Sequence, residues 1–390
     1  MQPSDPVSEI VIVGAGLAGL IQARALQKRG FDPLLIDPRP EDVIRRTNGD
    51  QRATALTPAS VERLGLPAAW LAEHGQQIGQ MVVDGGLLEP LEPGQALHLE
   101  SGAWVVFNDD LRRFLLDDMQ LKGAFGAAVE GSDGVAGARV LRLANGQAMP
   151  ARLVIAADGK QSNLRRREGI QRHLRDFQQT ALTGVIEHSA SHEGRALQRF
   201  LRGGTLAFLP LQDGDRGYRS SFIWVEPSRT AKALFALQPA ILAERMQARL
   251  GPVLGTLSAP QDADWGAFPL TAHHCDTLIA DRLALIGEAA HSLHPLAGQG
   301  LNLSIKDAEA LTDAVVAQRR AGLDVGDLEG LRDYERARRA DTARLTSVTT
   351  ALHDVFHRGP APIRAIATAG LKAIDRVAPL KAFFQRQANR

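Results

Sequence analysis

Three glycines and an acid near the N-terminus are the first residues whose spacing could do chemistry. Gly14, Gly16 and Gly19 follow a short apolar run in the order GAGLAG, and Asp37 closes the next apolar run. Glycines at this spacing allow a tight turn, close approach of the backbone to a pyrophosphate, and close packing of a helix on a strand. The pyrophosphate would sit at the helix N-terminus, where free N–H groups and the dipole favour negative charge. Asp37 could accept both ribose hydroxyls of an adenosine, which argues against a 2′-phosphate there. The motif predicts dinucleotide binding, and the alternative is a glycine-rich turn beside a solvated acid.

Two further segments place a polar residue beside an apolar run. Residues 50–56 (DQRATAL) put Arg52 in a polar loop, where its guanidinium could pair with phosphate or stack on a ring, or could simply lie on the surface. Residues 153–159 (LVIAADG) end a buried strand in Asp158 and Gly159. Ligands of α/β sheets bind at the carboxyl ends of strands. The segment therefore indicates either a second contact with the same cofactor or an ordinary type I turn.

Residues 285–303 (LIGEAAHSLHPLAGQGLNL) carry the richest pattern. A buried strand ends near Glu288, a loop with proline and glycine follows, and a helix begins near Gly300 to Asn302. The free N–H groups and dipole of that helix start would stabilise an isoalloxazine ring that becomes anionic on reduction, in the manner of an oxyanion hole. A purely structural corner is the alternative, but such a corner has no need for GQG.

The surrounding elements indicate how these segments meet. Residues 9–13 and 32–37 read as buried strands, and residues 17–29 between them have helical spacing, so the chain begins as a βαβ unit with a parallel sheet. Residues 80–107 and 180–227 read as short strands broken by glycine and proline, which is typical of an antiparallel sheet. We therefore predict an α/β fold: a Rossmann-like dinucleotide-binding domain with an inserted, mainly antiparallel β-sheet substrate domain and a helical C-terminal tail.

Composition narrows the function classes. The 390 residues carry 45 Lys plus Arg against 44 Asp plus Glu, so no global field attracts nucleic acid, and a charged partner must meet a local patch. A single cysteine, Cys275, excludes an internal disulfide framework and a thiolate zinc site. No apolar run approaches the ~20 residues of a membrane span. The N-terminus lacks the basic residues of a secretory leader, so a cytoplasmic location is expected.

The order of the four motifs resembles that of the single-component FAD-dependent aromatic hydroxylases of the p-hydroxybenzoate hydroxylase class. Within that class the chain most resembles the ubiquinone-biosynthesis hydroxylases, the UbiH/UbiI/UbiF group. The resemblance runs from about Glu9 to the C-terminus and includes YERARRADTARL and APIRAIATAGLKAIDRVAPLKAFF. It implies FAD as cofactor, NAD(P)H as a transient reductant and O2 as co-substrate. The chain has no second GxGxxG after a strand, which suits a transient nicotinamide.

The resemblance also assigns residues to the cofactor. The ADP half of FAD would be held by Gly14, Gly16, Gly19 and Asp37, and its pyrophosphate and ribityl region by Arg52 and Asn108. Asp158 and Gly159 match the segment that serves both FAD and the nicotinamide cofactor. The loop and helix start beside the isoalloxazine would be formed by Pro295, Gly298, Gly300, Leu301 and Asn302. Glu288 departs from the family, which usually has Asp there, and its carboxylate is one methylene longer.

The same resemblance divides the chain into parts. The FAD-binding domain would comprise residues 1–78, 108–178 and 271–345, the substrate domain residues 79–107 and 179–270, and a C-terminal helical region residues 346–390.

The chemistry implied is hydroxylation of the ring of a (poly)prenylated phenol in ubiquinone biosynthesis, through a flavin 4a-hydroperoxide and without a metal. The alternatives are a FAD-dependent hydroxylase of another small aromatic compound, a flavoprotein with different chemistry, and a non-enzymatic prenyl-binding carrier. By the same resemblance, Pro295 beside the isoalloxazine is a candidate catalytic residue. Tyr218 could contact the substrate hydroxyl or be a strand-edge tyrosine, and His294 or His291 could tune a proton or be structural.

Other side chains have less specific expectations. His273 and His274 are expected to be exposed and inert. Four aromatic residues on strands could line a long apolar pocket or belong to the core: Phe200, Phe208, Phe222 and Trp224.

The C-terminus suggests a membrane partner. Residues 361–390 hold six basic residues against Asp375 alone, interleaved with apolar residues at mostly helical spacing. Such a segment can lie on an anionic leaflet. The alternative is that its apolar face packs on the FAD domain, which Pro379 slightly favours. We therefore expect a lipophilic phenolic substrate and peripheral contact with the inner face of the cell membrane or with a ubiquinone-biosynthesis complex, and no nucleic acid.

Overall fold

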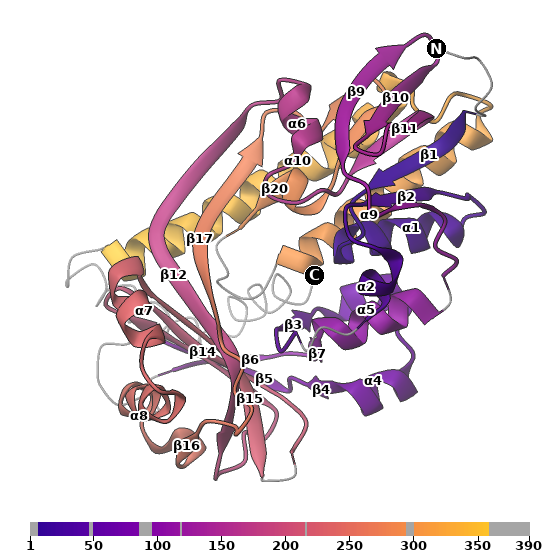
Figure 1. Cartoon of the computed structure of the whole chain (residues 1–390). Helices are drawn as coiled ribbons and strands as arrows, with labels where there is room; N and C mark the ends of the chain where they lie inside the picture. The colour runs from indigo at the N-terminus through magenta and orange to yellow at the C-terminus, as the bar shows by residue number, and fades with distance from the viewer. Residues whose placement is uncertain are drawn as a thin grey trace.

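The computed structural model describes residues 7–46, 50–85, 96–117, 119–214, 217–293 and 300–358. Two large sheets and a small one organise this part of the chain (Figure 1).

The first sheet contains the N-terminal βαβ unit. Its eight strands among the described residues are β1 (Ser8–Val13), β2 (Leu34–Asp37), β8 (Gly123–Phe125), β9 (Val129–Val135), β10 (Ala138–Leu143), β11 (Ala148–Ala156), β18 (Ile279–Ala280) and β19 (Leu283–Leu285). The order is β18-β19-β11-β1-β2-β8, and β1 runs parallel to both β2 and β11. Because β1, β2, β11 and β19 are parallel, their carboxyl ends meet at one edge, where the first, third and fourth motifs lie.

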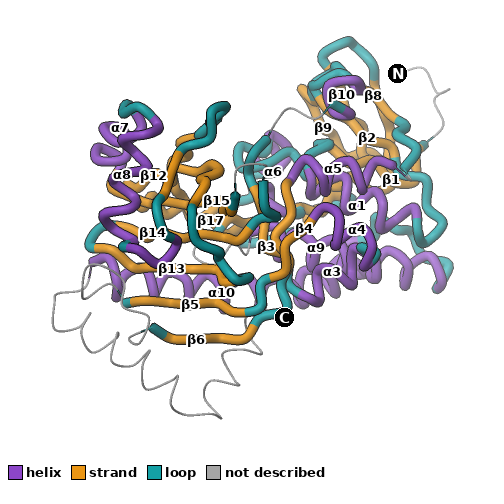
Figure 2. Tube along the Cα trace, turned by 90° about the horizontal axis from the view of Figure 1, so that it is seen from below, coloured by secondary structure: helices purple, strands orange, loops and turns teal. Residues whose placement is uncertain are grey.

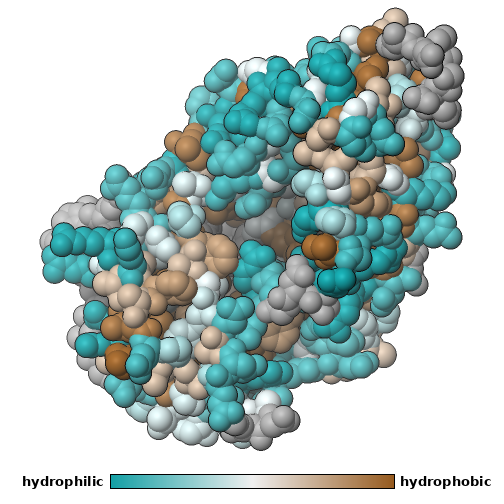
Figure 3. Space-filling view, in the orientation of Figure 1, coloured by the Kyte–Doolittle hydropathy of each residue, from teal (hydrophilic) through white to brown (hydrophobic). Residues whose placement is uncertain are grey.

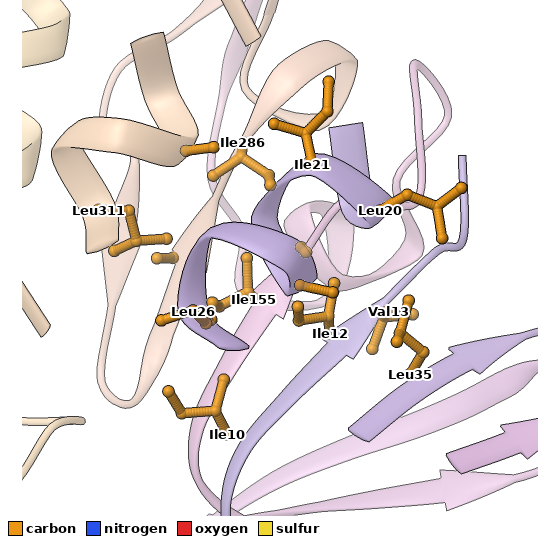
Figure 4. Close-up of a cluster of buried hydrophobic side chains, with 14 of the residues drawn as sticks. Ile10, Ile12, Val13, Leu20, Ile21, Leu26, Leu35, Ile155, Ile286 and Leu311 are labelled. Atoms are coloured by element: carbon orange, nitrogen blue, oxygen red, sulfur yellow. The ribbon is translucent and has the colours of Figure 1, made fainter. Parts of the chain in front are cut away.

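Helices pack against this sheet and against the small third sheet. They are α1 (Leu17–Gln27), α2 (Glu41–Arg45), α3 (Pro58–Leu64), α4 (Ala68–His74), α5 (Asn108–Asp117), α6 (Asn163–Arg167), α9 (Gly300–Arg320) and α10 (Leu328–His353). Fully buried Ile12 of β1, Leu26 of α1 and Leu311 of α9 belong to one core cluster (Figure 4). Ile10 and Ile12 are buried, as are Val11 and Val13, because strands of a covered parallel sheet are apolar on both faces.

The second sheet is mainly antiparallel. Its nine strands in the described ranges are β5 (Gln80–Asp84), β6 (Leu97–Glu100), β12 (Arg172–His188), β13 (Arg195–Leu201), β14 (Gly204–Pro210), β15 (Tyr218–Pro227), β16 (Leu257–Ser258), β17 (Gly266–Cys275) and β20 (His291–Ser292). Only the β13–β5 pairing is parallel within that part of the chain. Figure 2 shows β13, β5 and β6 side by side at its edge.

Two helices, α7 (Ser228–Phe235) and α8 (Pro239–Leu250), pack on the second sheet, and the short helix η2 (Pro252–Leu254) follows them. Their core includes Phe208, Phe222 and Trp224, all at most 2% exposed. Phe200 is also buried and stacks on Phe356 of η4 (Asp354–Arg358). These four aromatic side chains therefore belong to packed clusters.

Connections between the two sheets bring the cofactor motifs toward the inserted domain. A third sheet, β3 (Ala53–Leu56), β7 (Trp104–Phe107) and β4 (Gly75–Gln77), carries the Arg52 segment at one end. The fourth motif leaves β19 through η3 (Gly287–Ala289), and its β20 then pairs with β17 of the second sheet. The predicted α/β architecture with an inserted antiparallel sheet is confirmed. No helix in the described ranges has the length and apolar character needed to cross a bilayer.

Candidate flavin site

The glycines of the turn between β1 and α1 differ in the space that surrounds them. A Cβ added to Gly14, whose φ is +108°, would lie 2.4 Å from the carbonyl oxygen of Ala157. A Cβ on Gly19 would lie 1.8 Å from the carbonyl oxygen of Gly14, whereas one on Gly16 would meet nothing within 4 Å. Gly14 and Gly19 are thus required by the protein's own packing. Gly16 opens onto free space at the N-terminus of α1, which fits a pyrophosphate that approaches the backbone closely.

Asp37 ends β2 beside this turn. Its Oδ2 accepts a hydrogen bond from the N–H of Ala15 at 2.7 Å, and its Oδ1 accepts one from Nε of Arg39 at 2.8 Å. Burial alone would raise the pKa of Asp37, but the hydrogen bonds from Arg39 and Ala15 hold it below its usual value. The carboxylate is therefore a fixed, ionised acceptor beside the glycine turn. Arg39 was missed in the sequence, although its place two residues after the acid was the available signal.

Asp158 follows β11 at the same edge of the sheet. Its Oδ2 accepts the N–H of Asn163 at 2.8 Å, at the start of α6. Its Oδ1 is buried and has no hydrogen-bond partner among the described residues. Gly159 has φ of +78° and open space where a Cβ would be. An orphaned carboxylate oxygen beside an open glycine fits a cofactor that donates a hydroxyl.

The Arg52 segment lies on the small third sheet. The guanidinium of Arg52 pairs with both carboxylate oxygens of Asp50 at 2.8 and 2.7 Å, and lies 5.4 Å from the ring centre of Phe268. The N–H of Asn108 donates to the carbonyl of Arg52, so the structure brings these two predicted residues together. The pair with Asp50 raises the pKa of Arg52, and the charge of Glu288 adds to that rise. Charged groups of the second and fourth motifs therefore lie near each other.

Arg112 is a further candidate that the sequence did not single out. It lies on α5, one helical turn after Asn108, and its Nε and Nη1 are buried without a hydrogen-bond partner in the described ranges. Burial alone would raise the pKa of Asp50, but the hydrogen bonds from Arg52 hold it below its usual value, and the charge of Arg112 adds to that lowering. A buried guanidinium with unpaired N–H groups next to the Arg52 segment can take an anionic oxygen. The helical spacing from Asn108 was the only available signal.

The fourth motif is described on both sides of its loop. Glu288 is exposed on η3, Leu301 is partly buried, and Gly300 begins α9 with open space where a Cβ would be. The side chain of Asn302 accepts from the N–H of Thr57 at 3.1 Å and donates to the carbonyl of Ala55 at 2.9 Å. Asn302 thus joins the start of α9 to the β3–α3 connection. His294, Pro295 and Gly298 lie outside the described residues.

A buried carboxylate holds the flanks of that loop. Asp307 of α9 accepts from the N–H of Gly287 at 2.9 Å, from Nε2 of His291 at 2.7 Å, and from Nε of Arg338 on α10 at 2.8 Å. Burial alone would raise the pKa of Asp307, but His291 and Arg338 hold it below its usual value. His291 is thus engaged by Asp307, and sequence reasoning missed the acid because its three donors come from separate elements.

His273 was expected to be exposed, and that expectation is wrong. It is 1% exposed, and its Nδ1 lies 2.8 Å from Oγ of Ser292 in β20, while its Nε2 has no partner among the described residues. Burial, together with the nearby charges of Arg165 and Arg172, lowers the pKa of His273 to about 3. His274 is exposed as expected. Neighbouring residues on a strand face opposite sides, so only one of the two could have been exposed on a sheet covered on one face.

Tyr218 lies at the start of β15, opposite His188 in the register. Its ring is stacked on His188 at 6.2 Å between ring centres and meets His192 edge-on at 6.4 Å. His188 and His173 lie at opposite ends of β12. The end that contains His173 pairs with the part of β17 that also pairs with β20. Tyr218 is therefore placed on the second sheet, away from the β20 edge.

A family model and the sequences of known proteins assign the chain to the same family. The model of the FAD binding domain family matches residues 7–349. The chain is 34% identical to ubiquinone hydroxylase UbiL of Rhodospirillum rubrum, with 99% of this chain and 90% of the relative covered. It is 29% identical to 3-demethoxyubiquinol 3-hydroxylase of Escherichia coli, with 96% of each covered.

The fold agrees with a solved structure as well. The crystal structure of p-nitrophenol 4-monooxygenase PnpA from Pseudomonas putida superposes with a TM-score of 0.77 at 18% identity, with 98% of each chain covered. The open glycine cradle and the orphaned oxygen of Asp158 fit the cofactor that the family binds. The chain thus belongs to the FAD-dependent monooxygenases of the FAD binding domain family, in the group that contains the ubiquinone hydroxylases.

Proposed function

We propose that this NAD(P)H-dependent FAD monooxygenase hydroxylates the aromatic ring of a (poly)prenylated phenol in ubiquinone biosynthesis. The observation that carries the proposal is the similarity to a ubiquinone hydroxylase over 99% of the chain. The open cradle at Gly16 supports the flavin part of it, because a protein that bound no dinucleotide would have no use for that space.

The proposed cofactor residues act by binding and orientation. The turn of Gly14, Gly16 and Gly19 and the N-terminus of α1 would hold the pyrophosphate, and Asp37 the adenosine ribose. Arg52 and Arg112 would add positive charge on the opposite side. Glu288 would reach the ribityl region with its longer side chain, and Asn108 would support it from α5.

The isoalloxazine end is proposed to rest on the start of α9. When bound, FAD supplies the electron transfer and oxygen activation of this enzyme class. The free N–H groups at Gly300 and Leu301, with the dipole of α9, would stabilise negative charge on the ring. Pro295, Gly298 and His294 would close the site from the loop. Tyr218 lies toward the other end of the second sheet, so the phenol contact predicted for it is not part of this proposal. We propose the same division into a FAD-binding domain, a substrate domain and a C-terminal helical region that the sequence predicts.

Location follows from the substrate class. A polyprenylated phenol dissolves in lipid, so we propose peripheral contact with the inner face of the cell membrane or with a ubiquinone-biosynthesis complex. The basic segment 361–390 was predicted to make that contact, and it lies outside the described residues.

Deletion of the gene tests the substrate. We expect loss of ubiquinone and accumulation of a prenylated precursor that lacks one ring oxygen, detected by mass spectrometry and corrected by the wild-type gene but not by the Gly16→Ala variant. A deletion strain with normal ubiquinone and no accumulated precursor would contradict the proposal. Accumulation of a different, non-prenylated aromatic compound would instead support a hydroxylase of another small aromatic.

A further inference from the structure

The turn between α7 and α8 presents apolar side chains outward. Residues 233–242 (ALFALQPAIL) carry no charge. Phe235 is 43% and Ile241 38% exposed, and four smaller residues around them are exposed too: Ala233, Ala236, Pro239 and Ala240. The inward faces of the helices are separately apolar, since Ala231, Leu242 and Met246 are buried against the second sheet. Figure 3 shows apolar colouring over this part of the surface. We call the exposed set the α7–α8 surface.

Unpaired cations flank this surface. Arg229, Lys232 and Arg245 are exposed, and none forms an ion pair within the part of the chain that the structure describes. Lys232 lies three positions before Phe235, and Arg245 four positions after Ile241, so each cation shares a helix face with an apolar side chain.

Several cations on other surface helices are paired, although Arg320 of α9 has no ion pair in the described ranges. Arg45, Arg46, Arg113 and Arg332 each pair with a carboxylate three or four residues away. On α7 and α8, the exposed acid is Glu244. The α7–α8 surface therefore combines exposed apolar side chains with positive charge that has no internal counterpart.

We infer that the α7–α8 surface docks on an anionic lipid bilayer. Phe235 and Ile241 would enter the boundary between headgroups and acyl chains, and Lys232, Arg229 and Arg245 would lie among the headgroups. Two large apolar side chains at a helix turn are too few for a stable protein interface, which buries at least ~1,200 Å² in total. A bilayer needs no such area because each inserted side chain and each cation contributes separately.

This inference rests on the proposed function, because a substrate dissolved in lipid is what gives a bilayer contact its use. The helices α7 and α8 pack on the second sheet, which belongs to the proposed substrate domain, and they lie at the outer edge of the molecule (Figure 1). Bilayer docking there would bring the substrate domain to the membrane.

Vesicle flotation of the full-length, FAD-loaded protein tests the inference. The probes are vesicles of phosphatidylcholine and phosphatidylglycerol in equal parts, and vesicles of phosphatidylcholine alone. The test variant is the double substitution K232E/F235S. The matched control is R320E/L323S, which changes one exposed cation without an ion pair in the described ranges and one exposed apolar residue at the end of α9 and the turn after it. FAD content and melting temperature confirm that both variants are folded.

We expect wild type and R320E/L323S to float with the anionic vesicles in low salt, and to bind neutral vesicles and high-salt samples less. K232E/F235S should bind the anionic vesicles about tenfold more weakly or worse. Wild-type protein that does not float would overturn the inference. Binding of K232E/F235S to anionic vesicles as strong as that of wild type would overturn it too. If truncation after Pro360 then abolished binding, the contact would be assigned to the C-terminal tail. A concentration-dependent self-association that K232E/F235S removes, without vesicle binding, would assign the surface to a second copy of the chain instead.

The proposed hydroxylase activity is measured separately, as oxidation of NAD(P)H stimulated by a short-chain, water-soluble phenol without vesicles. K232E/F235S should keep that rate. Loss of flotation with the rate preserved separates failure of the bilayer inference from failure of the proposed function.

Discussion

At the scale of single residues, the three glycines of the β1–α1 turn have different tasks. Gly14 and Gly19 face backbone atoms of the protein, whereas Gly16 faces free space. A methyl group at Gly19 should therefore impair folding, whereas a methyl group at Gly16 should leave folding intact and impair FAD binding.

We predict that Gly16→Ala folds normally and loses FAD. Its φ of −74° suits alanine, so the melting temperature of the apoprotein should hardly change, while FAD affinity falls about tenfold or more. Gly19→Ala should instead destabilise the apoprotein by at least ~1 to 3 kcal/mol, because its Cβ would collide with backbone. Melting of the apoproteins and FAD titration distinguish the two. A Gly16→Ala protein that binds FAD as the wild type does would remove the cradle assignment.

His273 makes a prediction about acid stability. Its pKa of about 3 in the folded protein is below the usual 6.5, so between these values the unfolded chain binds a proton that the folded chain does not. Stability from this group is complete above pH 6.5 and is lost as pH falls toward 3, by about 2 kcal/mol at pH 5.

Denaturant unfolding at pH 8 and pH 5 checks this effect. His273→Gln should show a smaller loss of unfolding free energy between the two pH values, and His274→Gln, whose ring is exposed, should keep most of the wild-type loss. Equal losses in wild type and His273→Gln would show that this buried histidine does not govern the slope.

At the scale of elements, Asp307 connects three segments. It joins α9 to η3 through Gly287, to β20 through His291, and to α10 through Arg338. Because η3, β20 and α9 flank the loop of the fourth motif, this carboxylate ties together the described segments on either side of that loop.

We predict that Asp307→Asn is strongly destabilising and also changes the flavin. Leaving Arg338 and His291 without their buried counter-charge should cost ~3 to 5 kcal/mol of unfolding free energy. The matched control is Asp324→Asn, whose partner Arg282 lies nearer the surface, and it should cost at most ~1 kcal/mol.

Flavin absorption and FAD affinity distinguish the two roles of Asp307, because a residue that only stabilised the fold away from the flavin would change neither. Asp307→Asn should shift the visible spectrum and weaken FAD binding, and Asp324→Asn should change neither. If Asp307→Asn folds poorly, Arg338→Gln provides the same comparison from α10. Unchanged flavin spectra in both Asp307→Asn and Arg338→Gln would rule out an effect of this network on the flavin.

The elements also show which features were predictable. The βαβ unit, the strand ends at Asp37 and Asp158, and the helix after Gly300 each depend on neighbouring residues, so local spacing was enough to predict them. The Asp307 network, the burial of His273 and the pairing of β20 with β17 depend on contacts between distant segments, for which one sequence gives no signal. Arg39 and Arg112 lay close to recognised motifs, but a lone arginine is usually a surface residue.

At the scale of the whole molecule, the two sheets are tied together beyond the strands. Tyr334 of α10 donates to the carbonyl of Leu285, which ends β19, and so anchors the helix to the first sheet. At the other end, Asp354 pairs with Arg175 of β12 and Phe356 stacks on Phe200 of β13. The helix α10 thus spans from the carboxyl edge of the first sheet to the second sheet, visible in Figure 1. A cofactor on one sheet and a substrate on the other would be held at a fixed separation.

The most direct test of the central claim is the fate of labelled dioxygen. Purified, FAD-loaded protein is given NAD(P)H, heavy-oxygen O2 and a prenylated phenol, with Gly16→Ala protein as the matched control. We predict that the phenol accelerates NAD(P)H oxidation and that mass spectrometry finds one labelled oxygen on its ring, with neither effect in the control. Equal oxidation rates with and without the phenol, together with no labelled product, would contradict the account.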